Sequence, residues 1–375
     1  MITSRILWTR ASLCLVALGS AACQDVVESP IAPELSVVHG NPGQPDAFEV
    51  YSQNLYLGGD TGPLFSLDFT NIGAILAATN QFWSDVQASN IPERAAEIVD
   101  EIDERRPHVV SLQEAFRFVL LNGSFQPVGG LDLLAAVESE IANRGLPYEV
   151  AVSQEATSST LPLAFSGGAP SLLLNFTDRV AILRRTDVNV LDMAQGQYAA
   201  RFSLGPVTLI RAWARLTVDH LGTPHHFVAT HLETQALAPV QAGQAYELEN
   251  VVVAGLDGVT IIAGDLNSDA AAGAGSPSWT PTYDSFLAAG FTDVWATAPG
   301  PRHATGVTCC MADDLLGNAT LDERIDFVLV RSSAISSDEL QSNRGWFRAE
   351  VVGDEPNDRT PSGLWPSDHA GLAAL

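Results

Sequence analysis

The chain has 375 residues, of which 46% are hydrophobic and 17% are charged, and its formal net charge at pH 7 is −25. This length allows one large domain or two ordinary ones, and the hydrophobic content is sufficient for a globular core. The charge excludes the broad basic face from which nucleic-acid-binding proteins draw most of their affinity. An anionic ligand would therefore need a local source of positive charge, such as a divalent cation or a few convergent arginines.

The first 23 residues have the pattern of an export signal. Two arginines precede an apolar stretch at 11–18, and small residues follow it up to Cys23. The stretch is shorter than the about 20 apolar residues of a transmembrane helix, so we expect a signal peptide over 1–23. The segment ending at Cys23 also resembles a bacterial lipobox, although Ser20 stands where that motif prefers Leu. Both a lipoprotein of the outer or cell-surface membrane and a secreted or periplasmic protein therefore remain open.

Residues 24–46 contain four prolines and no periodic apolar pattern, which predicts a flexible tether. After the export segment the only cysteines are Cys309 and Cys310, so a disulfide framework is excluded. The pair is either two buried small residues or a disulfide between neighbours. A metal site of cysteines alone would lack its other ligands.

Apolar periodicity predicts one domain over residues 47–375. Strands are expected at 48–53, 107–113, 171–183, 207–218, 226–230, 259–263, 325–330 and 370–375, and helices at 72–86, 95–105, 131–142 and 240–254. Segments rich in glycine and proline predict surface loops at 122–130, 164–170, 272–281 and 299–306. The elements do not alternate strictly and no repeat of 20–50 residues occurs, which favours packed sheets covered by helices.

Polar side chains of catalytic types stand at the ends of most predicted strands. They are Asn54, Glu114, His231, Asp265 with Asn267, Asp326, and Asp368 with His369. Polar groups at the ends of apolar strands are costly to bury without partners. So many of them in one chain predict that the strand ends converge on one site.

These residues lie in segments that resemble the endonuclease/exonuclease/phosphatase superfamily, which includes DNase I, abasic-site endonucleases, neutral sphingomyelinases and inositol polyphosphate 5-phosphatases. The matching segments follow the family order: SQNLYLG at 52–58, VSLQE at 110–114, THLE at 230–233, GDLN at 264–267, RIDF at 324–327 and SDH at 367–369. The resemblance implies an exported bacterial member with a DNase I-like α+β fold. That fold is a four-layer α/β/β/α sandwich of two mainly antiparallel sheets flanked by helices.

The resemblance implies a phosphoesterase that depends on Mg²⁺ or Mn²⁺ and acts on phosphodiesters or phosphomonoesters. Glu114 is the expected primary metal ligand, Asn54 adds an amide oxygen, and Asp368 adds a carboxylate directly or through water. The cation would act as a Lewis acid and neutralise charge on the phosphate.

By the same resemblance, Asp265 orients or deprotonates the attacking water, and Asn267 holds the water and phosphate in line. His231 and His369 donate hydrogen bonds to the phosphate, and which of them acts as acid or base is left open. Asp326 pairs with His369 and fixes its tautomer.

The resemblance places Arg179 on a strand bordering the site, where it either contacts a phosphate oxygen or pairs with Asp178. Four further histidines have no motif around them and are expected at the surface: His220, His225, His226 and His303. Four tryptophans in or near predicted loops form either a lipid-facing patch or part of the core: Trp279, Trp295, Trp346 and Trp365.

The family leaves nucleic acids, phospholipids, small phosphodiesters and inositol phosphates as substrate classes. Negative charge disfavours a nuclease, export fits sphingomyelinase-like or phospholipase C-like cleavage, and an inositol phosphatase would need a basic cluster that the chain lacks. A binding protein that has kept the fold and lost catalysis is the alternative from another class. Such a protein should lack one of the main catalytic residues, and all are present. We expect a monomer, attached to a membrane if Cys23 is lipidated.

Overall fold

The first of two large sheets carries both ends of the predicted domain. The computed structural model describes residues 47–66, 68–204, 207–299 and 306–375. The sheet order is β15 (Ala349–Val352), β16 (Gly371–Ala374), β1 (Val50–Asn54), β2 (Val109–Gln113), β6 (Ala169–Arg185), β3 (Arg117–Asn122) and β4 (Pro127–Asp132), and β5 (Tyr148–Ser166) also pairs with β6. Only β1 and β2 are parallel, so both strands end at the same edge.

The second sheet has the order β13 (Thr292–Asp293), β14 (Asp326–Ser332), β12 (Val259–Asp265), β11 (Thr223–His231), β10 (Ala212–His220) and β7 (Asn189–Gln197). Its one parallel pair is β11 with β12, and the register places His231 opposite Asp265. A separate small ribbon consists of β8 (Phe202–Leu204) and β9 (Val207–Leu209). The strand predicted at 207–218 is therefore two strands, interrupted at residues 210–211.

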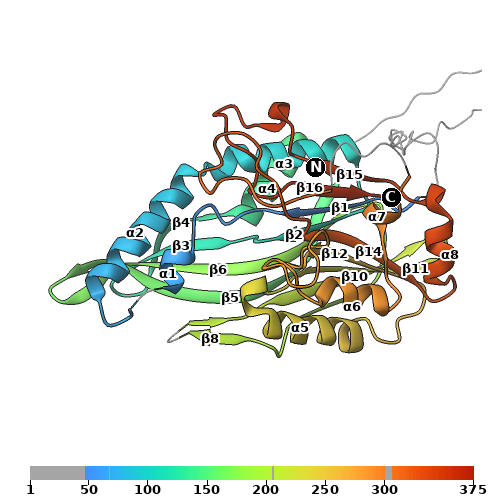
Figure 1. The fold of residues 1–375 in the computed structure, drawn as a ribbon. Coiled ribbons are helices and arrows are strands. Elements are labelled where there is room, and N and C mark those ends of the chain that lie inside the picture. The colour runs from blue at the N-terminus through green and yellow to red at the C-terminus, as the bar shows by residue number, and fades with distance from the viewer. Residues whose placement is uncertain (1–46, 67, 205–206, 300–305) are drawn as a thin grey trace, which may run out of the picture. The chain divides into compact units, whose positions relative to one another are not determined.

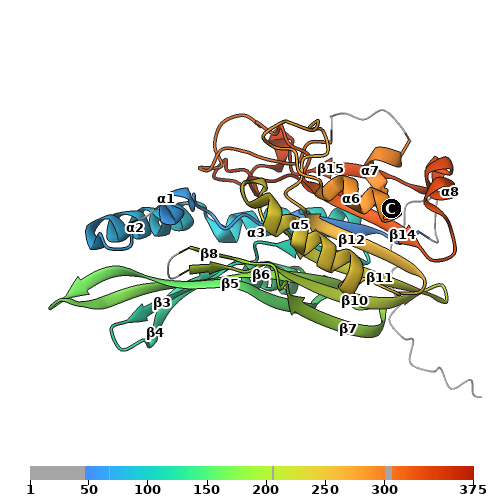
Figure 2. The ribbon, with the colours of Figure 1, turned by 60° about the horizontal axis from the view of Figure 1, so that its bottom comes forward.

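The two sheets pack face to face, and helices cover both outer faces (Figures 1 and 2). Helices α2 (Ile72–Ala88), α3 (Ile91–Arg105) and α4 (Leu133–Arg144) pack on the first sheet, where Phe82, Ile98 and Val137 join its core. Between the sheets, Ile182 meets Phe227 in a second apolar cluster. On the far side α5 (Ala238–Glu247), the π-helical turn Leu248–Val252 and α6 (Thr282–Ala288) cover the second sheet. The predicted four-layer sandwich is confirmed.

Short elements complete the described chain. They are α1 (Gly62–Phe65), α7 (Val294–Thr297), α8 (Ser337–Ser342) and the 3-10 turns Gln235–Leu237, Arg344–Trp346 and Pro356–Asp358. The predicted signal peptide, the tether, Cys23 and His303 lie outside the described residues. Within the described ranges, no helix is both long and apolar enough to cross a membrane.

Local sequence signals explain where the helices begin. The side chain of Asp132 accepts a hydrogen bond from the backbone N–H of Ala135, so α4 begins at residue 133 rather than at the predicted 131. Asn71 caps α2 in the same way. Helix α3 has a proline in its first turn and begins four residues before the predicted start at 95, which places Arg94 inside the helix.

Two of the predicted loops are β-hairpins. Residues 122–130 form the turn and second strand of the β3–β4 hairpin, and residues 164–170 form the tip of the long β5–β6 hairpin. Strand β5 was missed because serines and threonines interrupt its apolar pattern. Only glycine fits at position 130 of strand β4, because a Cβ there would lie 2.1 Å from the carbonyl oxygen of Phe118.

One of the histidines expected at the surface is buried, and two others are half-buried. His226 is 8% exposed and its ring bonds to the Thr217 hydroxyl and the Asp257 carbonyl, which corrects the surface prediction. The rings of His220 and His225 contact Phe48. Trp295 and Trp365 are buried too, so the four tryptophans do not form one exposed patch.

The last nine residues are a structural element and not a tail. Strand β16 pairs with β1 on one side and β15 on the other, and Leu372 is 2% exposed between the sheets. The strand follows His369 directly, so it fixes the position of that imidazole.

Deleting residues 367–375 should therefore remove the cooperative unfolding transition in urea, because the first sheet loses an interior strand. As a milder comparison, Leu372→Ala keeps His369 and should cost about 2–4 kcal/mol of unfolding free energy. A truncated chain that unfolds at the wild-type midpoint would contradict this reading of the C-terminus.

Candidate active site

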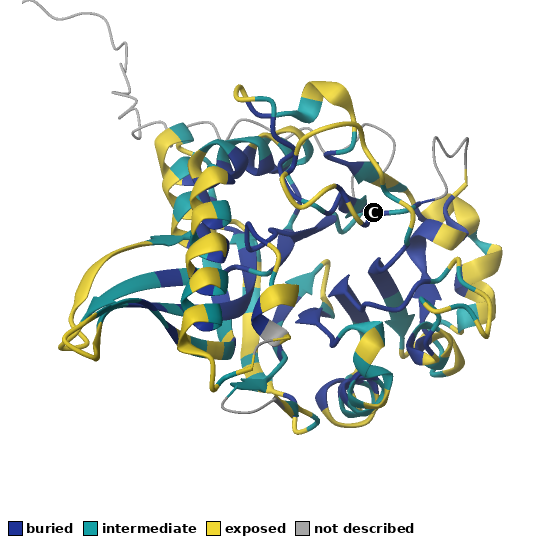
Figure 3. Cartoon of the chain, turned by 60° about the vertical axis from the view of Figure 1, so that its left-hand side comes forward, coloured by how far each residue is buried: buried dark blue, intermediate teal, exposed yellow. Residues whose placement is uncertain are grey.

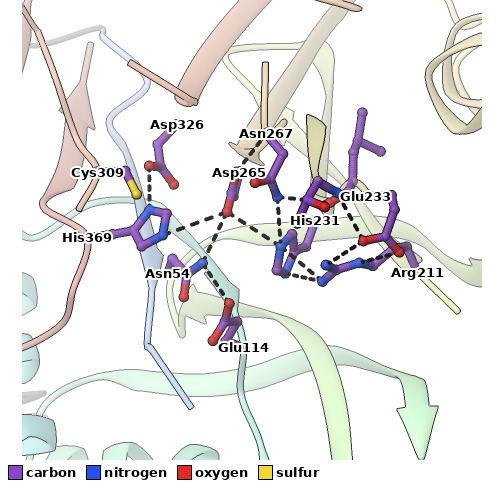
Figure 4. Close-up of polar contacts among 12 residues, drawn as sticks. Asn54, Glu114, Arg211, His231, Glu233, Asp265, Asn267, Cys309, Asp326 and His369 are labelled. Carbon is purple, nitrogen blue, oxygen red and sulfur yellow. Dashed lines mark hydrogen bonds and ion pairs between the residues drawn. The ribbon is translucent and has the colours of Figure 1, made fainter. Parts of the chain in front are cut away.

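The strand ends predicted from the sequence meet in one place. Asn54 and Gln113 end the parallel strands β1 and β2, and Glu114 follows directly. In the second sheet Asp265 lies opposite both His231 and Asp326. The close-up in Figure 4 shows side chains from both sheets pointing toward one another around Asp265.

Asp265 lies at the centre of this cluster and is 2% exposed. Its Oδ1 accepts the backbone N–H of Asn267 at 2.8 Å, and its Oδ2 accepts the side-chain amide of Asn54 at 3.2 Å. Nε2 of His231 and of His369 lie 3.5 and 4.0 Å from Oδ2. Burial, followed by repulsion from Asp326, raises the pKa of Asp265. A carboxylate with a raised pKa is a stronger base, which suits removal of a proton from water.

His369 forms the predicted pair with Asp326. Its Nδ1 donates to Asp326 Oδ2 at 2.8 Å, and the Thr308 hydroxyl donates to the same oxygen at 2.7 Å. Burial opposes the charged imidazole, but Asp326 and then Asp368 outweigh it and hold the pKa of His369 well above its usual value. Nδ1 is therefore committed to Asp326, and Nε2 is the nitrogen that faces Asp265.

His231 has the opposite electrostatics. Burial and the neighbouring Arg211 hold the pKa of His231 well below its usual value, so the ring is neutral. The side-chain amide of Asn267 lies 3.1 Å from Nε2 of His231 and also donates to the Leu232 carbonyl. The two histidines flanking Asp265 thus differ in charge, a distinction that the sequence left open.

The three predicted metal ligands also belong to this cluster. Asn54 donates to Glu114 Oε1 at 3.3 Å, while the backbone N–H of Leu57 donates to Glu114 Oε2 at 2.9 Å. The amide oxygen of Asn54 accepts the N–H of Tyr56 and keeps a second lone pair. Asp368 is next to His369, and burial, together with repulsion from Glu114, raises the pKa of its carboxyl.

These residues fit a hard divalent cation. The donors on Glu114, Asp368 and Asn54 are oxygens, which Mg²⁺ and Mn²⁺ prefer. Burial and then repulsion from Glu114 raise the pKa of Asp368, and a cation bound there would favour its ionised form. Among the described residues, Asp265, Asp326 and His369 also place ligand atoms within 4.8 Å of one another.

The sequence did not predict that the side chains of Arg211 and Glu233 lie behind His231. The guanidinium of Arg211 has a nitrogen 2.9 and 3.0 Å from the two ring nitrogens of His231. It also pairs with Glu233 at 3.2 Å and lies 3.8 Å from Asp178. Burial opposes the ionised form of Glu233, but Arg211 outweighs it and lowers the pKa. No motif marks Arg211, and the continuous strand predicted at 207–218 concealed the break that exposes it to the site.

The side chain of Arg179 already bonds to two protein acceptors. Its Nε donates to the Ala115 carbonyl at 2.7 Å and its guanidinium pairs with Asp132, the cap of α4. The predicted alternative partner, Asp178, faces Arg211 instead. Phosphate binding by Arg179 stays a prediction.

The two cysteines lie beside His369. Cys309 and Cys310 form a disulfide between adjacent residues. The backbone N–H of Met311 donates to the Asp368 carbonyl, and that of Ala370 donates to Thr308. The segment around the disulfide is therefore hydrogen-bonded to the residue before His369 and to the residue after it.

A cavity of about 490 Å³ lies apart from these residues, between α3 and the segment at 357–358. Its lining is dominated by acidic side chains: Glu97, Asp100, Glu101, Asp103, Glu104 and Asp358. Such a lining repels a phosphate ester, so this cavity is not the substrate site.

Two packed sheets whose strand ends gather carboxylates, amides and imidazoles define a hydrolytic site for an anionic ester. A sequence model described as "Endonuclease/Exonuclease/phosphatase family" matches residues 71–369, and the chain belongs to this family. Members of the family hydrolyse phosphoester bonds and typically depend on a divalent metal. No curated protein sequence matches the chain significantly.

Solved structures support the fold. A family protein from Leptotrichia buccalis is 14% identical with a TM-score of 0.53, over 88% of this chain and 99% of that one. A family protein from Beutenbergia cavernae is 18% identical with a TM-score of 0.51, covering 87% and 70%. A mannosyl-6-phosphatase from Bacteroides thetaiotaomicron is 15% identical with a TM-score of 0.51, covering 88% and 99%. At these identities the likeness concerns the fold alone.

Replacing Arg211 with methionine should raise the pKa of His231, because a cation in contact with the ring is removed. Titration of the imidazole Cε1–H signals by NMR measures this shift. Arg215→Met is the matched control, since Arg215 lies on the same strand but pairs with Asp192. Equal shifts in both variants, or none in either, would contradict the assigned contact.

Proposed function

We propose that the chain is an exported phosphodiesterase that depends on Mg²⁺ or Mn²⁺. The observation that carries the proposal is the placement of Asp265. This buried carboxylate of raised pKa lies between a neutral imidazole and a cationic one, beside three oxygen donors suited to a hard cation. Export rests on the sequence pattern of residues 1–23.

Glu114, Asn54 and Asp368 would hold the metal. When bound, the ion supplies a Lewis acid that neutralises charge on the phosphate and lowers the pKa of a water. Asp265 would orient the attacking water and accept its proton at Oδ2, the oxygen that faces Asn54 and the two histidines. The amide of Asn267, fixed by the Leu232 carbonyl, keeps the water and phosphate aligned.

The histidines take different roles in this proposal. His369, kept cationic by Asp326, donates from Nε2 to a phosphate oxygen where negative charge grows. His231 is neutral and supplies a hydrogen bond whose geometry Arg211 fixes. His369 is therefore the candidate general acid for the leaving group, and His231 is not.

An uncharged region of the first sheet is the feature on which we base our proposal for the substrate class. Residues 118–131 and 156–177 contain 14 and 22 residues without one charged side chain, and we call them the uncharged extension. A composition with 17% charged residues would place about six charges there. The extension comprises most of β3 and β4, the tip and outer half of the β5–β6 hairpin, and their turns (Figures 1 and 3).

The extension leads away from the site. Glu114 precedes it by four residues and Asp178 follows it directly. On one face, Val119, Asn175 and Thr160 stand in register across three strands. Phe125 and Val128 near its β3–β4 turn are 64% and 56% exposed. A neutral surface in an acidic protein suits a substrate with an uncharged body, so we favour a zwitterionic phospholipid over a nucleic acid.

Other substrates remain alternatives. The mannosyl-6-phosphatase of similar fold acts on a phosphomonoester, as its name states, and a phosphomonoester is an alternative here. Extracellular nucleic acid is a second. A catalytically inactive lipoprotein that only binds such ligands is the alternative from another class.

The wild-type chain should hydrolyse bis-p-nitrophenyl phosphate with Mg²⁺ or Mn²⁺ and stop when EDTA is added. Asp265→Ala should reduce kcat by at least about a hundredfold, because it removes the proposed base. Asp284→Ala, an exposed aspartate on α6, is the control and should leave the rate unchanged. If wild type and Asp265→Ala are equally inactive with both metals, the inactive binding protein is favoured.

The uncharged extension should bind phosphatidylcholine vesicles, and Phe125→Asp should weaken sedimentation with them by about tenfold or more, because a charge enters an apolar contact. Cys23→Ser in every chain removes any lipid anchor from the comparison. Leu221→Asp is a matched control, since Leu221 is 70% exposed and, like Phe125, has a positive φ in a strand-connecting turn. Hydrolysis of plasmid DNA in preference to phosphatidylcholine and sphingomyelin would identify a nuclease instead.

A further inference from the structure

Arg94 is a fully buried cation behind the predicted metal ligands. It lies on α3, is 2% exposed, and its guanidinium donates only to uncharged oxygens. The acceptors are the main-chain carbonyls of Leu55, Tyr56 at 2.7 Å and Pro366 at 2.9 Å, and the Ser89 hydroxyl at 3.1 Å. In the described part of the chain, no carboxylate oxygen lies within ion-pair distance of it. A buried arginine without a paired carboxylate is costly, so these contacts call for a function.

Two of these acceptors belong to peptide groups that also contact the predicted metal ligands. The carbonyl of Leu55 shares a planar peptide with the N–H of Tyr56, and this N–H donates to Asn54 Oδ1 at 2.9 Å. The carbonyl of Tyr56 shares the next peptide with the N–H of Leu57, which donates to Glu114 Oε2 at 2.9 Å. In a trans peptide the C=O and the N–H point in opposite directions. Arg94 therefore bonds the carbonyl of each peptide group, and the N–H on the opposite side of that peptide group points at a ligand side chain.

The backbone between these two planes is unusual. Tyr56 has φ = +54°, in the left-handed region that residues other than glycine rarely adopt. Such a conformation costs about 1–3 kcal/mol and persists only where its surroundings impose it. Arg94 bonds the carbonyls on both sides of this residue, and its guanidinium carbon lies 5.4 Å from the centre of the Tyr56 ring.

The third main-chain carbonyl that Arg94 bonds, that of Pro366, belongs to the C-terminal segment. Pro366 precedes Ser367, whose hydroxyl donates to the Asn54 carbonyl at 2.7 Å, and Asp368 follows. Arg94 thus joins the segment after β1 to the segment that carries Asp368. Two hydrogen bonds with one peptide group between them connect this guanidinium to Asn54, and two more connect it to Glu114. A single hydrogen bond connects it to Pro366, two residues before Asp368.

We propose that Arg94 is a positioning residue for the divalent cation: it sets Asn54 and Glu114 through two peptide planes and tethers the Asp368 segment, without touching the ion. This inference rests on the proposed function, which supplies the metal ligands. The guanidinium suits the task because its planar fork serves several acceptors at once, which a lysine ammonium cannot do in the same geometry.

The test is calorimetric titration of the full chain with Mn²⁺, together with urea unfolding of each variant. Arg94→Met should weaken Mn²⁺ binding about tenfold or more in the folded protein, as changes behind metal ligands typically do. Arg331→Met is the matched control. Arg331 also donates to two main-chain carbonyls, of Ala289 and Val253, and stacks over Phe291, but lies outside the site. It should lose stability and keep wild-type Mn²⁺ affinity.

If Arg94→Met does not fold, Arg94→Lys decides the matter, because one ammonium cannot reach all four acceptors. It should weaken Mn²⁺ binding by several-fold. Wild-type affinity in a folded Arg94 variant overturns this inference and leaves the proposed function standing. No Mn²⁺ binding by the wild-type chain contradicts the proposed metal site, and the inference fails with it.

Discussion

The site depends on balancing several carboxylates that are buried close together. Asp265 and Asp326 are buried and Asp368 is half-buried, all three near the imidazole of His369. The pKa values of Asp265 and Asp368 are raised as a result. Such a cluster is stable only if positive charge or hydrogen-bond donors surround it. His369 supplies a charge at the centre and Arg94 supplies one that acts on Asp368, whereas Arg211 is already paired with Glu233. The remaining negative charge is what a divalent cation would neutralise.

This balance explains features of the fold that would otherwise be incidental. Among the described strands, each sheet has one parallel pair, and that pair delivers side chains to the site, where Asn54 meets Glu114 and His231 meets Asp265. The C-terminal strand is interior to its sheet, so the backbone that directly follows His369 is paired on both edges. The segment with the Cys309–Cys310 disulfide then closes over the Asp326–His369 pair through Thr308.

The sequence predicted most of the residues that meet at the site, but not the arginines that contact them from behind. Asp265 and Glu114 were found because each follows an apolar strand, and this pattern survives without knowledge of tertiary contacts. Arg211 was missed because a break in the predicted strand has no signal in an apolar run. Arg94 was missed because the helix was predicted to begin at residue 95, whereas it begins at Ile91. Both act through contacts distant in sequence, as the Arg94–Pro366 bond shows. The opposite charges of the two histidines could not be predicted either, since they depend on which cation or carboxylate each ring meets.

The central claim is that Glu114, Asn54 and Asp368 bind the catalytic cation next to Asp265. Crystals of the chain soaked in MnCl₂ and measured at the manganese absorption edge test it most directly. We expect an anomalous peak at coordination distance from a Glu114 carboxylate oxygen, about 2.0–2.3 Å, with Asp368 and Asn54 around it. A peak only elsewhere, at the acidic surface of α3 or at Cys309 and Cys310, at Mn²⁺ concentrations that support hydrolysis, would contradict it.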